Sequence, residues 1–96
     1  MGYAEMKRQI IDALSPYHPK RIGIFGSYSR GQDHNKSDLD VLVRFGEALS
    51  LIQLIRLESE LSEKLGIQVD LITEGAIKNQ RIRKSIEEEL DVIYEA

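Results

Sequence analysis

Residues 25–45 read FGSYSRGQDHNKSDLDVLVRF, and the rest of the chain is organised around this stretch. An apolar strand ending at Phe25 leads into a Gly-Ser turn and a short polar helical turn, and a second strand then begins with Asp38 and Asp40. Because side chains alternate between the two faces of a strand, these two acids project from the same face, about 7 Å apart along an extended backbone. The two carboxylates therefore point toward a common site.

The composition limits what this stretch can belong to. The chain has 96 residues, which suits one domain, so we expect a single minimal domain over residues 1–96. With 42% hydrophobic and 30% charged residues, the chain is globular rather than disordered. The net charge of −3 argues against a general nucleic-acid-coating protein, whose binding requires a basic face.

Cysteine usage and hydropathy bear on location. The sequence contains no cysteine, which excludes disulfides, thiolate nucleophiles and thiolate metal sites. No apolar run reaches the length of about 18 residues expected of a membrane helix, and the N-terminus lacks the apolar core of a signal peptide. We therefore expect a cytoplasmic protein with no membrane segment.

Apolar residues recur at helical spacing in three segments, and short runs rich in Val, Ile and Leu lie between them. We expect the order αβαβαβα and an α/β fold, with a small mixed sheet of about three strands packed with helices. The helix expected over residues 48–65 should be capped by Gly66. Its expected packing stripe is Leu51, Leu54, Ile55, Leu61 and Leu65. The expected helices are residues 3–14, 48–65 and 80–94, and the short polar helical turn after Gly26 and Ser27 is the remaining helical element of this order. The expected strands are residues 21–25, 39–45 and 67–72.

A third acid, Asp70, lies inside the apolar run of the third strand, where Asp is disfavoured. If this strand lies beside the second one, three carboxylates meet, and each pair about 4 Å apart repels by roughly 4 kcal/mol at an effective dielectric of about 20. A domain stable by about 5 to 15 kcal/mol cannot tolerate this repulsion uncompensated. A cation or a proton must therefore be present.

Oxygen ligands of this kind select Mg²⁺, Mn²⁺ or Ca²⁺, and a carboxylate trio typically holds two Mg²⁺ ions that handle a phosphoryl or nucleotidyl group. A structural alternative remains open at this point. Asp38 could simply end the preceding turn, Asp40 could face solvent, and Asp70 could pair with Arg21 or Arg44.

The turn before the acids can bind phosphate. Gly26 and Ser27 expose backbone N–H groups at the start of a helical turn, where the missing side chain of Gly lets a phosphate come close. Arg30, one turn later, offers a fork of donors suited to phosphate oxygens. An ion pair of Arg30 with Asp33 or Asp38 is an equally good interpretation of that residue taken alone.

These motifs together resemble the minimal nucleotidyltransferases, or MNT domains, of the DNA polymerase β-like superfamily. The resemblance spans nearly the whole chain, although the usual pattern has Ala at the position of Ser29. It is carried by Gly26-Ser27-x-x-Arg30-Gly31, by Ser37-Asp38-x-Asp40, and by Asp70 in the third strand.

The resemblance implies a polymerase β-like nucleotidyltransferase fold and a two-metal reaction. An acceptor hydroxyl would attack the α-phosphate of ATP or another nucleoside triphosphate and release pyrophosphate, with two Mg²⁺ ions, or Mn²⁺, at the site. By the same analogy the catalytic and metal-binding residues are Asp38, Asp40 and Asp70, and the nucleotide-binding residues are Gly26, Ser27 and Arg30.

The resemblance also implies a partner. Relatives of this size resemble the antitoxin half of HEPN/MNT pairs, in which some MNT members silence an all-helical HEPN protein by transferring AMP to a tyrosine. Two other functions stay open: a binding module that neutralises a partner by contact alone, and nucleotidyl transfer to RNA or a small molecule. A homodimer is also compatible with the sequence.

Overall fold

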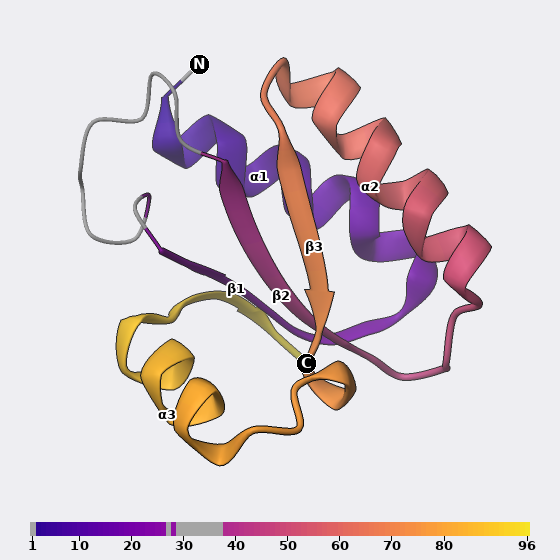
Figure 1. Cartoon of the computed structure of the whole chain (residues 1–96). Helices are drawn as coiled ribbons and strands as arrows, with labels where there is room; N and C mark the ends of the chain where they lie inside the picture. The colour runs from indigo at the N-terminus through magenta and orange to yellow at the C-terminus, as the bar shows by residue number, and fades with distance from the viewer. Residues whose placement is uncertain (1, 27, 29–37) are drawn as a thin grey trace.

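The computed structural model describes residues 2–26, 28 and 38–96 and forms a mixed α/β fold around one sheet (Figure 1). The strand order is β3-β2-β1-β4, with β2 and β3 parallel and the other neighbours antiparallel. None of the helices within these ranges is long and apolar enough to cross a bilayer. The elements are α1 (Tyr3–Leu14), a 3₁₀ turn (Ser15–Tyr17), β1 (Pro19–Phe25), β2 (Leu39–Phe45), α2 (Leu51–Leu65), β3 (Val69–Thr73), a second 3₁₀ turn (Glu74–Ala76), α3 (Gln80–Glu89) and β4 (Asp91–Glu95).

The expected fold class and mixed sheet are confirmed, and the helices lie on two sides of the sheet. Helices α1 and α2 lie together on one side, and α3 lies on the other (Figure 1). The core is formed where α1 and α2 pack against the sheet. Its fully buried side chains include Ile10, Leu14, Ile22, Ile24, Leu39, Val41, Val43, Leu57, Leu61 and Val69.

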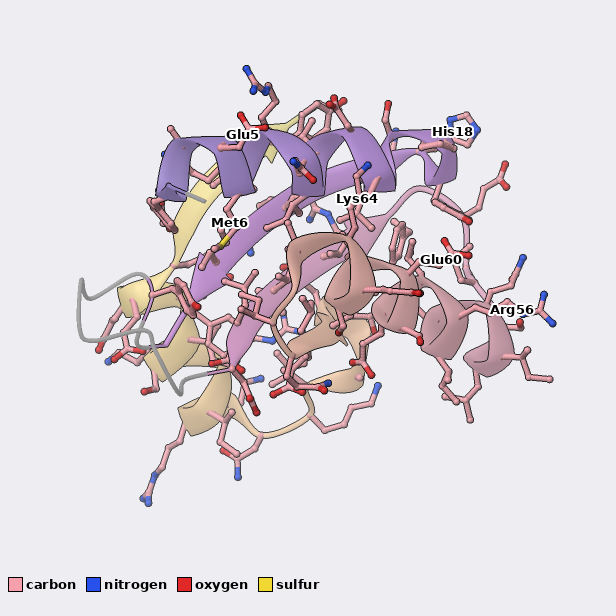
Figure 2. All side chains as sticks on the ribbon, turned by 90° about the horizontal axis from the view of Figure 1, so that it is seen from above. Glu5, Met6, His18, Arg56, Glu60 and Lys64 are labelled. Carbon is pink, nitrogen blue, oxygen red and sulfur yellow. The ribbon has the colours of Figure 1, made fainter. Side chains whose placement is uncertain are left out.

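Helix α1 packs as its sequence pattern predicts. Met6, Ile10 and Leu14 are buried, and a 3₁₀ turn containing Pro16 ends the helix. Figure 2 shows the two faces of this helix: Met6 points toward the sheet and Glu5 points away from it. The helix therefore covers the sheet with one apolar stripe.

Helix α2 has clear signals at both ends. Ser50 accepts a hydrogen bond from the backbone N–H of Gln53, and the Gln53 side chain accepts one from the Ser50 N–H, which forms a capping box. Gly66 caps the C-terminus with a φ of 72°, a left-handed conformation that favours glycine. The predicted C-terminal cap is confirmed.

The packing stripe predicted for α2 is wrong in its N-terminal half. Leu57, Leu61 and Leu65 are buried, whereas Leu51 and Ile55 are 72% and 58% exposed. The buried face belongs to the C-terminal half because only that half lies over the core. The N-terminal half instead lines an open groove of about 300 Å³ together with the edge strand β3 and the residues after it.

The predicted final helix is also wrong beyond Glu89. Leu90 has extended backbone angles, and residues Asp91–Glu95 form β4, which pairs antiparallel with β1. The run Asp-Val-Ile-Tyr is rich in β-branched and aromatic residues, which pack well on a pleated surface. The free edge of β1 supplies backbone partners that no local helical pattern could reveal, so the sheet has four strands.

Candidate active site

Asp40 and Asp70 lie side by side in neighbouring strands. Each is the second residue of its strand, and the parallel register of β2 and β3 pairs Asp40 with Asp70. Both are half-buried, while the preceding residues, Leu39 and Val69, are fully buried on the opposite face. The condition for these acids to be neighbours, that the third strand lies beside the second, is met, and the two carboxyls share one face of the sheet.

Asp38 precedes β2, is exposed, and completes an acidic neighbourhood. Burial raises the pKa of the Asp70 carboxyl above its ordinary value, and the negative charges of Asp38 and Glu58 raise that pKa further. A hydrogen bond with Asp38 acts in the same direction, and one with Asp40 acts against it. Asp70 therefore interacts with both of the other predicted aspartates, and a proton or cation is favoured at its carboxyl.

The donor chemistry of this neighbourhood fits a hard divalent cation. All three groups are carboxylates, which Mg²⁺ and Mn²⁺ prefer as ligands. Within residues 2–26, 28 and 38–96, however, no three His, Asp or Glu side chains are placed so that they could together bind a metal ion. The carboxyls are near one another, but they are not yet converged on a single point.

Gly26 has a role at this site that the sequence did not reveal. Its φ is 78°, and a Cβ added there would lie 2.4 Å from Oδ2 of Asp40. The preceding residue, Phe25, pairs directly with Asp40 across β1 and β2. Glycine is therefore required both for the left-handed turn and for the space that the Asp40 carboxylate occupies. The other two predicted nucleotide-binding residues, Ser27 and Arg30, lie outside the described residues.

The structural alternative for Asp70 is wrong, because the two arginines have other carboxylate neighbours. Arg21 donates to Oε1 of Glu74 at 2.6 Å, to Oε2 of Glu74 at 3.3 Å and to Oε2 of Glu87 at 3.3 Å. Arg44 lies 3.9 Å from Glu74. Arg21 pairs with Arg44 across β1 and β2, at the end of the sheet opposite to the Asp40–Asp70 pair, so Asp70 is not explained as a partner of either arginine.

Helix α2 contributes two polar residues next to Asp70 that the sequence analysis missed. Glu58 accepts a hydrogen bond from the backbone N–H of Leu71, and Ser62 accepts one from that of Val69. The i, i+4 spacing of Glu58 and Ser62 was the only signal available in the sequence. It shows that the two side chains share a helix face, but not that this face meets β3.

The comparisons with known proteins agree with this geometry. The model of the nucleotidyltransferase domain family matches residues 6–93. The chain belongs to this nucleotidyltransferase family. A provisionally named protein adenylyltransferase of Methanocaldococcus jannaschii is 53% identical over 78 residues, covering 81% of this chain and 78% of that protein. The protein adenylyltransferase MntA of Thermococcus cleftensis is 45% identical over 60 residues, covering 62% of this chain and 61% of that protein.

Solved structures of toxin–antitoxin proteins share the fold of this chain. A crystal structure of a toxin–antitoxin with AMP-PNP matches with a TM-score of 0.82 and 27% identity, covering 94% of this chain and 73% of that chain. A structure of a tri-AMPylated Shewanella oneidensis HEPN toxin in complex with an MNT antitoxin matches with a TM-score of 0.78. The second match, at 21% identity over 97% of this chain and 72% of that chain, shows the fold alone. The resemblance to minimal nucleotidyltransferases is thus confirmed.

Proposed function

We propose that this nucleotidyltransferase transfers AMP from ATP to a hydroxyl of a HEPN-type partner protein and acts as the antitoxin of a toxin–antitoxin pair. The observation that carries the proposal is the register of β2 and β3, which sets Asp40 level with Asp70 beside Gly26. The names of the adenylyltransferase relatives and the toxin–antitoxin match support the choice of acceptor. ATP is available in the cytoplasm, which is the location that we propose.

The proposed reaction is an in-line displacement at the α-phosphorus. The acceptor oxygen forms a bond to the α-phosphorus, the bond from that phosphorus to the bridging oxygen breaks, and pyrophosphate leaves. The hydroxyl proton passes to the Asp70 carboxylate, which lies beside Asp40 on the neighbouring strand. Gly26, Ser27 and Arg30 would hold the triphosphate.

We further propose that Asp38, Asp40 and Asp70 hold two divalent metal ions, Mg²⁺ or Mn²⁺. When bound, such ions stabilise the attacking and leaving oxygens. Asp40 and Asp70 are half-buried on β2 and β3, whereas Asp38 is exposed and precedes β2. The family match over residues 6–93 supports our view that residues 1–96 act as one domain.

Metal and nucleotide binding can be tested without turnover. We expect millimolar Mg²⁺ or Mn²⁺ with AMP-PNP to raise the melting temperature, since a ligand that binds only the native state stabilises it. Differential scanning fluorimetry would measure the shift, and the Asp38→Asn/Asp40→Asn variant should lose it. A melting temperature that stays constant at saturating metal and nucleotide would contradict the proposed site.

The acceptor can be identified by label transfer. Purified protein, Mg²⁺ and ATP labelled at the α-phosphate are added to a lysate of the source cells. We expect one labelled protein band that is absent with Asp38→Asn/Asp40→Asn and unaffected by Asp12→Asn, an exposed acid on α1. ATP labelled at the γ-phosphate is the second control, because nucleotidyl transfer leaves no γ-label on the acceptor.

The other outcomes separate the alternative functions. A labelled RNA or small molecule would move the acceptor away from protein. No label, together with a HEPN protein that co-purifies and stays inhibited, would show a module that neutralises its partner by contact alone.

A further inference from the structure

The backbone on both sides of Asp70 is held by helix α2. Strand β3 is at the edge of the sheet, where every second backbone N–H faces away from the neighbouring strand. Two of its N–H groups donate to side chains of α2: that of Val69 to Oγ of Ser62 at 2.9 Å and that of Leu71 to Oε2 of Glu58 at 2.7 Å. These two residues are the immediate neighbours of Asp70.

The spacing of the two contacts matches the geometry of both elements. Residues four apart on a helix lie on one face and are separated by about 6 Å along the axis. Residues two apart on a strand are separated by about 6.6 Å. Glu58 and Ser62 can therefore meet two successive outward N–H groups of β3 without distortion of either element. Ser62 is anchored in turn, because its hydroxyl donates to the Glu58 carbonyl at 2.9 Å.

We propose that Glu58 is a positioning residue for Asp70, and that its carboxylate, assisted by Ser62, fixes the peptide groups flanking Asp70 so that the Asp70 carboxyl faces Asp40. The inference rests on the proposed function, in which Asp70 is a catalytic residue. Edge strands without such contacts are free to shift or to pair with other chains. A small shift of β3 would move Asp70 away from Asp40, although both residues would remain present.

The hydrogen bond itself is tested by amide exchange, with no nucleotide or metal added. We expect Glu58→Ala to speed exchange of the Leu71 amide by about tenfold or more, as expected when a local hydrogen bond is lost. Glu58→Gln keeps an oxygen acceptor and should retain the protection. Glu60→Ala, an exposed glutamate on the same helix that is labelled in Figure 2, is the matched control. Circular dichroism would check that each variant is folded.

The functional consequence is tested on the same variants. We expect Glu58→Ala to lower kcat for AMP transfer by about 10- to 100-fold, the usual effect of losing a residue that orients a metal ligand, with KM for ATP nearly unchanged. Glu58→Gln should transfer at close to the wild-type rate. Mn²⁺ affinity, measured by electron paramagnetic resonance with AMP-PNP present, should fall about tenfold in Glu58→Ala and should not fall in Glu60→Ala.

Three outcomes would overturn the inference. In the first, the Leu71 amide of Glu58→Ala exchanges as slowly as that of the wild type. In the second, its exchange is faster but kcat and Mn²⁺ affinity are unchanged, which would mean that Glu58 only covers the sheet edge. Glu58→Gln could also fail as badly as Glu58→Ala, which would assign the effect to charge. Asp70→Asn, assayed in parallel, separates this inference from the proposed function. If Asp70→Asn transfers AMP normally, the proposed role of Asp70 is wrong, whereas the exchange result still tests the contact.

Discussion

The two ends of strands β2 and β3 differ in how their charges are arranged. At one end the charged side chains are all aspartates, and at the other end arginines lie next to glutamates. Asp40 and Arg44, which mark the two ends on β2, are four residues or about 13 Å apart. We call Asp38, Asp40 and Asp70 the acidic end, and Arg21, Arg44, Glu74 and Glu87 the paired end.

The paired end stabilises the fold, whereas the acidic end has the charges of a ligand site. At the paired end, Arg21 joins the 3₁₀ turn after β3 to helix α3, and its partners raise the pKa of its guanidinium. Attraction there stabilises the fold with the protein alone. At the acidic end, burial and neighbouring carboxylates raise the pKa of Asp70, so the fold keeps a repulsion that a bound cation would relieve. Unfavourable charge that the fold does not remove points to a ligand site.

The largest effect is expected at the acidic end. Asp40→Asn should lower the rate of AMP transfer by about 100- to 1,000-fold or more, as the loss of groups that stabilise a transition state does. The same change removes a negative charge from a repulsive cluster, so the metal-free protein should be at least as stable as the wild type. Initial rates with α-labelled ATP and melting temperatures would measure the two effects.

A strongly destabilised Asp40→Asn protein would contradict this assignment and would give Asp40 a structural role. Asp12→Asn on α1 is the control for losing one exposed acid. Its transfer rate should stay at the wild-type level.

Removing the ion pairs of Arg21 at the paired end should have the opposite result: the protein loses stability but keeps its rate of AMP transfer. Arg21→Met leaves Glu74, whose side chain is 11% exposed, without its main partner. Breaking a buried ion pair costs about 3 to 5 kcal/mol, and Arg21→Met should approach the lower value. Urea denaturation would measure the loss. Transfer at a temperature where the variant is folded should be within about threefold of the wild type, since Arg21 is remote from the acidic end.

The double variant Arg21→Met/Glu74→Met sharpens this prediction. Replacing both members of a buried pair by apolar residues is often neutral, so much of the lost stability should return. If the double variant is no more stable than Arg21→Met, the cost does not arise from an unpaired Glu74.

Gly26→Ala should affect both stability and activity, because the residue links the backbone turn to Asp40. A left-handed backbone costs alanine about 1 to 2 kcal/mol, and the added Cβ would also displace the Asp40 carboxylate. We expect a lower melting temperature and a lower transfer rate. Gly75→Ala is the matched control, because a Cβ there has no neighbour within 4 Å. Equal effects of the two substitutions would contradict the role of Gly26.

Local patterns in the sequence were sufficient to predict much of the acidic end. The i, i+2 spacing predicted one strand face for Asp38 and Asp40, although β2 begins only at Leu39, and an acid inside an apolar run singled out Asp70. The adjacency of Asp40 and Asp70 required only that the strands carrying them be neighbours, as the structure has them. The roles of Ser27 and Arg30 remain predictions from the same motif.

What the sequence could not predict depends on contacts between distant segments. β4 forms because β1 offers a free edge more than 60 residues earlier in the chain. The exposure of Leu51 and Ile55 depends on how far α2 extends beyond the core, and Glu58 meets Leu71 only because of the rotation of α2 against β3. Helical periodicity fixes which residues share a face, but it does not fix what that face contacts.

The smallest effect is expected at Glu87, the exposed glutamate of the paired end, and this effect depends on pH. Hydrogen bonds from Arg21 lower the pKa of Glu87 below its ordinary value of 4.5, and the positive charges of Arg21 and Arg83 act in the same direction. A carboxylate with a lowered pKa contributes stability that is complete above its unfolded pKa and is lost as the pH falls through its folded pKa. Because the Glu87 side chain is 41% exposed, Glu87→Gln should cost only about 0.5 to 1 kcal/mol near pH 7.

Urea denaturation from pH 7 to pH 3 should show the stability difference between wild type and Glu87→Gln shrinking below pH 4.5. Glu88→Gln, at the exposed neighbouring residue, is the control and should give a smaller difference at pH 7. A difference that grows as the pH falls would have the wrong sign for an Arg21–Glu87 pair and would move the anchor of α3 to Glu74 and Arg83, which donates to the Glu74 carbonyl at 2.8 Å.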